Sequence, residues 1–64
     1  MQLLYSNLYA TNNWTIRVEG HTYNTEEDYE SHKNMWIKSG FKIDYEVKMN
    51  EKRFVRYVRK IKNT

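Results

Sequence analysis

The densest group of chemically active side chains lies in residues 53–62, RFVRYVRKIK, where cations are interleaved with aromatic and aliphatic residues. Between Lys48 and Lys62, seven lysines and arginines stand against one acid, Glu51. Clustered cations can bind phosphates by releasing counterions, and an interleaved tyrosine can stack on a base. The same residue types suit a protein interface, where arginine and tyrosine often act as anchors. They also suit a solvated sheet edge that its charges protect from aggregation.

We predict that residues 53–62 form an edge strand whose cations are exposed and whose apolar residues are divided between the core and a partner. The spacing of Phe54, Val58 and Ile61 also suits a helix, but valine, tyrosine, phenylalanine and isoleucine favour a strand. Of the two interpretations that involve a partner, we favour a protein over a nucleic acid. The candidate partner-binding residues are Arg53, Arg56, Tyr57, Arg59 and Lys60, with Tyr57 and Arg59 as packed anchors.

The other residues that could do chemistry form no catalytic or metal-binding motif. The sequence has no cysteine, and its two glycines, Gly20 and Gly40, do not form a phosphate-binding loop. The serines lie in no nucleophile motif, and the two histidines, His21 and His32, have no cluster of further ligands beside them. We expect His32 to border the core or the surface. We therefore predict a non-enzymatic protein with no catalytic residue, no metal and no cofactor.

The charges are divided unevenly along the chain. Residues 1–31 contain one cation and five acids, a net charge of −4, whereas residues 32–64 contain ten cations and three acids, a net charge of +7. Four of the eight acids lie in residues 26–30, where they suit the positive end of a helix dipole, although an acidic docking patch is the alternative. Such asymmetry can attract a polyanion or an acidic protein surface.

One helix is predicted over about residues 26–38. Thr25 is a suitable N-cap, the acids that follow it favour a helix start, and Gly40 is placed to end the helix. Tyr29, His32 and Trp36 recur at helical spacing and should form the face that packs on a sheet.

Two alternating segments flank this helix and predict strands with one apolar and one polar face. In WTIRVEG the apolar positions are Trp14, Ile16 and Val18, and FKIDYEV alternates in the same way from Phe41 to Val47. We expect the helix to cover these apolar faces, with Trp36 packed against Ile16 and Ile43. Residues 2–10 should pair with the first of these strands and residues 53–62 with the second. The prediction is one α+β domain, residues 1–64, with one α-helix on a four-stranded antiparallel sheet in the order ββαββ.

The first and last strands of this prediction have apolar side chains on both faces. Leu3 and Tyr5 alternate with Leu4 in the first strand, and Val55 alternates with Phe54 in the last. Because one helix cannot cover both faces, some of this apolar surface should stay exposed, and contiguous exposed patches often mark interaction sites.

Composition indicates the class of protein. With 64 residues, no cysteine, no long apolar run and no secretory signal at the N-terminus, we expect a small cytoplasmic protein outside the membrane. Residues with AT-rich codons (Asn, Lys, Tyr and Ile) number 24, against 7 with GC-rich codons, which is typical of a low-GC bacterium or its phages and plasmids. We predict a phage- or plasmid-type regulator or inhibitor that occupies a surface of a bacterial protein complex. The alternative is direct nucleic-acid binding through the basic C-terminal strand, and a homo-oligomer would help to stabilise so small a chain.

Overall fold

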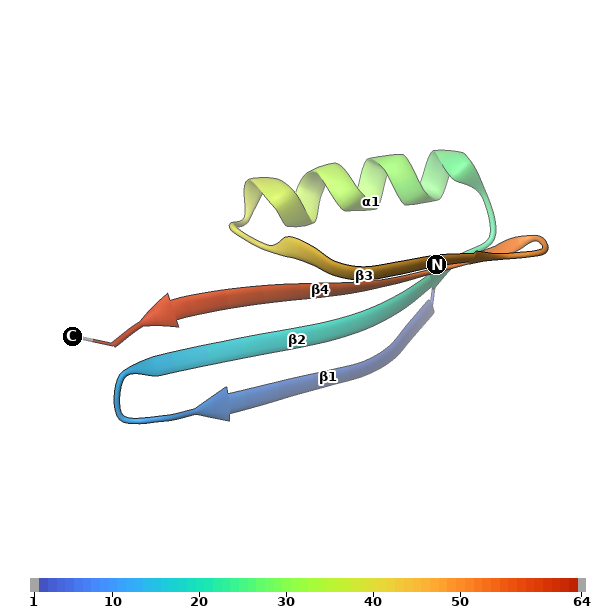
Figure 1. The fold of residues 1–64 in the computed structure, drawn as a ribbon. Helices are drawn as coiled ribbons and strands as arrows, with labels where there is room; N and C mark the ends of the chain where they lie inside the picture. The colour runs from blue at the N-terminus through green and yellow to red at the C-terminus, as the bar shows by residue number, and fades with distance from the viewer. Residues whose placement is uncertain (1, 64) are drawn as a thin grey trace.

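The computed structural model describes residues 2–63 as one helix packed on a four-stranded antiparallel sheet (Figure 1). The elements are β1 (Gln2–Ala10), β2 (Trp14–Tyr23), α1 (Glu26–Lys38), β3 (Lys42–Met49) and β4 (Lys52–Lys62). The predicted α+β class and the order ββαββ are confirmed, and the segment after Asn50 is a strand. Within residues 2–63, α1 is neither long enough nor apolar enough to cross a membrane.

The spatial order of the strands is β1-β2-β4-β3, so β4 lies inside the sheet. It pairs with β2 along its whole length, from Trp14 opposite Lys62 to Tyr23 opposite Arg53, and with β3 on its other side. The prediction that residues 53–62 form an edge strand is therefore wrong. An interior position pairs the backbone of β4 with a neighbour on both sides and buries the side chains of Val55 and Tyr57 completely.

The helix begins and ends where the local sequence predicts. The hydroxyl of Thr25 accepts a hydrogen bond of 3.1 Å from the backbone N–H of Asp28. Acids occupy the first turn, as the helix dipole favours. Beyond the last turn, Gly40 has a φ of 95°, a left-handed conformation that glycine adopts at little cost.

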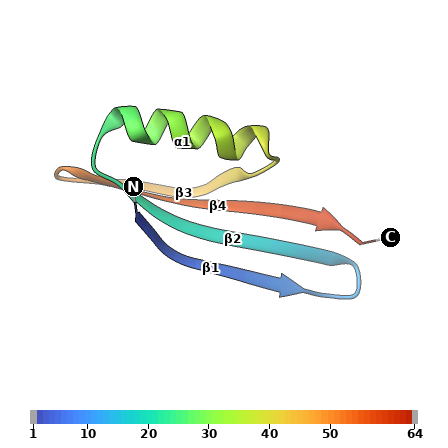
Figure 2. The ribbon, with the colours of Figure 1, turned by 180° about the vertical axis from the view of Figure 1, so that it is seen from behind.

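The helix covers the face of β2 opposite to the one predicted. His21 and Tyr23 point toward α1 and contact His32, whereas Ile16 and Val18 lie on the other side of the sheet. Figures 1 and 2 show α1 on one side of the sheet only. The alternation correctly distinguishes the two faces of β2, but the more polar one is buried.

The core lies between α1 and the strands β2, β3 and β4. Its buried apolar and aromatic members are Tyr23, Tyr29, Phe41, Val55 and Tyr57, with Trp36 and Ile43 packed against them.

Trp36 is a contact point of the helix, as predicted, but it is only partly buried. Its ring stacks on Tyr57 at 5.7 Å between centroids and meets the ring of Phe41 edge-on at 4.5 Å. Ile43 packs against the same cluster, whereas the predicted contact with Ile16 is wrong because that residue lies on the opposite face.

Candidate partner-binding surface

The side of the sheet that faces away from α1 is here called the open face (Figure 2). It carries a large set of aromatic and apolar side chains. Strand alternation and the observed registers place its members. A bulge between Ile43 and Tyr45 places Tyr45 and Val47 on this face, whereas Phe41 and Ile43 stay on the helix side. The prediction that residues 41–47 have one apolar face is therefore wrong, because the bulge reverses the alternation halfway along β3. The principal residues of the open face are Tyr5, Tyr9, Trp14, Ile16, Val18, Tyr45, Val47, Phe54, Arg56, Val58 and Lys60.

A row of four residues crosses the middle of the open face. Tyr5 lies opposite Gly20, Gly20 opposite Arg56, and Arg56 opposite Tyr45, one residue from each strand. A Cβ atom on Gly20 would lie 2.4 Å from Cε1 of Tyr5, so the absent side chain leaves room for the tyrosine ring. Arg56 therefore lies at the centre of the face between two tyrosine-bearing strands.

Arg56 is held in place by its neighbours. Its Nε donates a hydrogen bond of 2.7 Å to Oδ2 of Asp44, and its guanidinium carbon lies 5.5 Å from the ring centroid of Tyr45. The hydrogen bond to Asp44 raises the pKa of Arg56, so its charge is permanent. A partly exposed arginine fixed beside tyrosines is a typical anchor of a protein interface.

Apolar side chains extend from this row toward the far end of the face. Val18 and Val58 lie directly opposite each other, with Ile16 two residues further along β2. Beyond them, Nζ of Lys60 lies 4.5 Å from the ring centroid of Trp14. The open face thus has an apolar middle, aromatic residues along it and cations among them, a composition that resembles the centre of protein interfaces.

The five predicted partner-binding residues do not form one surface. Arg56 and Lys60 lie on the open face, whereas Arg53, Tyr57 and Arg59 point to the helix side of β4. Tyr57 has an exposed fraction of 0%, so the folded chain cannot present it to a partner as an anchor. Arg59 lies beside Phe41, 6.0 Å from its ring centroid, near the end of the helix.

Arg53 has a structural role on the helix side. Its Nη2 donates to Glu26 at 2.7 Å, its Nη1 donates to Glu46, and its guanidinium carbon lies 4.1 Å from the ring centroid of Tyr29. The hydrogen bonds to Glu26 and Glu46 raise the pKa of Arg53. These contacts join the start of α1 to β3 and β4. Glu26, one acid of the cluster in residues 26–30, therefore has a structural role.

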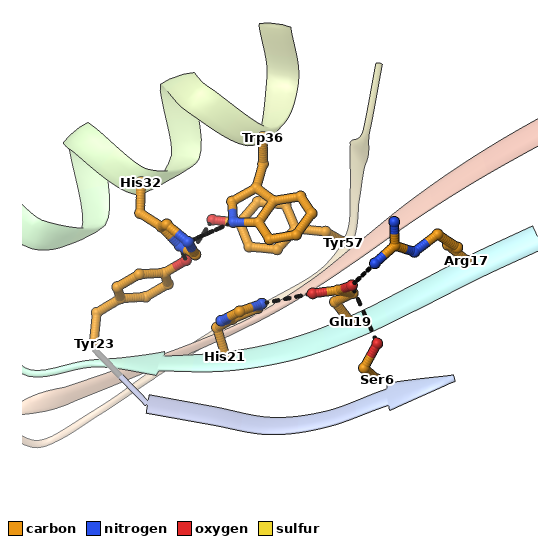
Figure 3. A network of polar contacts seen from close by, with 8 residues as sticks. All are labelled: Ser6, Arg17, Glu19, His21, Tyr23, His32, Trp36 and Tyr57. Atoms are coloured by element: carbon orange, nitrogen blue, oxygen red, sulfur yellow. Dashed lines mark hydrogen bonds and ion pairs between the residues drawn. The ribbon is translucent and has the colours of Figure 1, made fainter. Parts of the chain in front are cut away.

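A polar network between α1 and the sheet was missed by the sequence analysis (Figure 3). Glu19 and His21 on β2 are each only 4% exposed. Oε2 of Glu19 accepts hydrogen bonds from Nη2 of Arg17 at 2.7 Å and from Oγ of Ser6 at 3.1 Å. Nε2 of His21 lies 3.2 Å from Oε1 of Glu19. These partners compensate for burying a carboxylate, which unpaired would be costly.

The network continues to the helix through His32. The ring of His32 lies 4.8 Å from that of His21 between centroids and contacts the hydroxyl of Tyr23 through Nδ1. The Nε1–H of Trp36 donates to Nε2 of His32 at 2.6 Å, and the hydroxyls of Tyr23 and Tyr57 lie 2.9 Å apart. Burial lowers the pKa of His32, and His21 beside it lowers it further.

A carboxylate beside a histidine can act as an acid–base pair in catalysis. Glu19 and His21 are nearly fully buried, and the ring of His21 contacts His32 and Trp36 of α1, so the network joins the helix to the sheet. Within residues 2–63 no group of three histidines or carboxylates is placed to hold a metal ion. The signal that could have revealed the network is His21-x-Tyr23, which ends β2 with two aromatic rings on the face assigned as polar.

No protein-family model, curated protein or solved structure matches this chain.

Proposed function

We propose that this chain is a non-enzymatic binding module that docks its open face on a protein partner. The observation that carries the proposal is the row centred on Arg56, which lies on an uncovered sheet face between the tyrosines of both outer strands. Arginine, tyrosine and tryptophan are the residue types that most often dominate binding energy at protein interfaces.

The charge of the open face indicates the chemistry of the partner. Lys42, Arg56 and Lys60 lie on this face, against the carboxylate of Asp44 beside Arg56. A complementary partner surface would have an apolar centre and acidic groups around it. The composition is rich in amino acids that AT-rich codons encode, as in proteins of low-GC bacteria and their phages. In line with this composition, we infer a phage- or plasmid-type regulator or inhibitor that occupies such a surface on a bacterial protein complex.

Direct binding of single-stranded nucleic acid is the alternative. The pairs Lys60–Trp14 and Arg56–Tyr45 combine a cation with an aromatic ring, as stacking platforms for bases do. Against this alternative, the aliphatic residues Ile16, Val18 and Val58 occupy positions where a series of stacked bases would need aromatic rings. The protein partner therefore has the stronger support.

Affinity capture from a low-GC bacterial lysate, with and without nuclease, tests the proposal. The baits are the wild type, Arg56→Ala, and Lys38→Ala as a control on the exposed surface of α1. We expect a discrete protein on the wild type and on Lys38→Ala, unaffected by nuclease and lost from Arg56→Ala. Equal capture by all three baits would contradict a role for the open face.

A titration against mixed-sequence nucleic acid separates the alternative. Binding through phosphates would weaken steeply between about 50 and 200 mM salt, and neutralising one contacting cation would reduce the logarithmic salt slope by about 1. The variant for this assay is Arg56→Ala with Lys60→Ala, because Arg53 is needed for ion pairs within the fold. Tight binding at low salt that this variant loses would make nucleic acid the primary partner.

A further inference from the structure

β1 is an unpaired edge of the sheet, and it lacks most of the features that normally protect an edge. Its sequence, QLLYSNLYA, contains no charged residue and no proline over nine residues. Leu8 and Tyr9 are 66% and 54% exposed, and Leu3 and Leu4 are also exposed. An edge strand of this kind presents free backbone N–H and C=O groups to another strand.

The opposite edge of the same sheet is protected. Along its eight residues β3 carries four charged side chains, and the bulge between Ile43 and Tyr45 interrupts its middle. In β1 the bulge lies near the start, between Leu3 and Tyr5, and leaves a regular register with β2 from Tyr5 to Ala10. The two edges therefore differ in the features that prevent pairing, and β1 is the one open to a second strand.

We propose that β1 pairs with β1 of a second copy of this chain, forming a symmetric dimer with one continuous eight-stranded sheet. An antiparallel pair of identical strands is related by a two-fold axis, so each surface residue meets its counterpart in the other copy. Because β1 is uncharged, such self-pairing brings no like charges together, whereas the basic and acidic side chains of the chain lie on other elements. A partner of different sequence would form no ion pair with this edge, because β1 has no charged side chain.

Strand alternation limits the registers of this dimer. Ser6 lies on the helix side of β1, opposite Glu19, and Asn7 lies on the open face, opposite Val18. Pairing centred on either Ser6 or Asn7 places like faces of the two strands on the same side. The exposed leucines Leu3 and Leu8 then lie along the junction on the helix side, whereas α1 packs on β2, β3 and β4 (Figure 1).

The dimer has a consequence for binding. The two-fold axis runs perpendicular to the sheet, so both helices lie on one side and both open faces on the other. The tyrosines Tyr5 and Tyr9 of the two copies would join the two faces into one surface. Dimerisation itself can be measured without any partner, so its test does not depend on the proposed function.

Sedimentation equilibrium between about 1 μM and 1 mM protein measures the association directly. We expect the wild type to reach twice the monomer mass within this range. In both registers Asn7→Lys places two lysines opposite or diagonal to each other across the axis, which should weaken the dimer about tenfold or more. The matched control is Asn34→Lys on the exposed surface of α1, which should dimerise as the wild type does.

A charge-swap experiment keeps the test specific. Mixing Asn7→Lys with Asn7→Asp should restore the doubled mass, because opposite charges then meet across the axis. Circular dichroism confirms that each variant is folded, and Leu8→Lys, at an exposed side chain of the junction, replaces Asn7→Lys if that variant is not. A wild type that stays monomeric at every concentration would overturn the proposal, as would dimers weakened by Asn34→Lys but not by Asn7→Lys. A monomer whose β1 amides gain protection from exchange only when another protein is added would assign the edge to that protein instead.

Discussion

Adjacent residues Tyr57 and Val58 provide a sharp test of which sheet face forms the core. Tyr57 points into the core and is fully buried, whereas Val58 points to the open face opposite Val18. Tyr57→Ala should therefore unfold or nearly unfold the chain, and Val58→Ala should leave it folded. If the other face of the sheet formed the core, Val58→Ala would be the more destabilising of the two variants.

The magnitude follows from burial and from the size of the chain. Removing a buried aromatic side chain costs about 3–5 kcal/mol. At about 0.05–0.15 kcal/mol per residue, a chain of 64 residues has a total stability of about 3–10 kcal/mol. Tyr57→Ala would remove a large share of this stability. Tyr57→Phe removes only the hydroxyl that lies 2.9 Å from that of Tyr23 and should cost about 1 kcal/mol.

Urea and thermal denaturation followed by circular dichroism measure these differences. A loss of about 1 kcal/mol in the free energy of unfolding lowers the Tm of a domain of this size by about 4–8 °C. The Tm of Tyr57→Phe should therefore lie about 4–8 °C below that of the wild type. Val58→Ala serves as the neighbouring control and should lose less stability than Tyr57→Ala. A stable, cooperatively folded Tyr57→Ala variant would refute the assignment of the core.

Three further perturbations test the helix and the open face. Thr25→Ala removes the cap on Asp28 and should cost about 1 kcal/mol, measured by urea denaturation, whereas an unchanged midpoint would contradict the capping role. The pKa of His32 in the folded chain is lower than its ordinary value of about 6.5. Between these two pKa values the unfolded chain therefore binds more protons than the folded chain. The free energy of unfolding should therefore fall as pH drops from about 6.5 to the folded pKa, and His32→Gln should lose this part of the pH dependence. Arg56→Ala should weaken partner binding by about 2 kcal/mol or more in isothermal titration, with Lys38→Ala unchanged, and equal affinities would contradict the anchor role.

The local elements of this chain follow from short-range physical chemistry, so the sequence predicts them well. The threonine cap, the acidic first turn and Gly40 locate the helix without any tertiary information. The two hairpins join strands that are neighbours along the chain, which makes β1–β2 and β3–β4 pairing predictable. Of the predicted partner-binding residues, Arg56 and Lys60 lie on the open face, and Arg53, Tyr57 and Arg59 lie on the other side because alternation divides one strand between two faces.

What the sequence by itself determined is the number and kind of elements and, in β2 and β4, the division of the strand into two faces. The bulge in β3, which places Tyr45 and Val47 opposite to the face of Ile43, was not predicted. Only the tertiary structure decided which face α1 covers and that β4 lies between β2 and β3. Glu19 and His21 on the polar face of β2 can be buried because Arg17 beside them, Ser6 of β1 and His32 of α1 provide contacts, and the last two come from other elements that only the tertiary structure brings there. The position of β4 depends on its pairing with β2, from which α1 and β3 separate it in the chain, and no local pattern predicts such a long-range pairing.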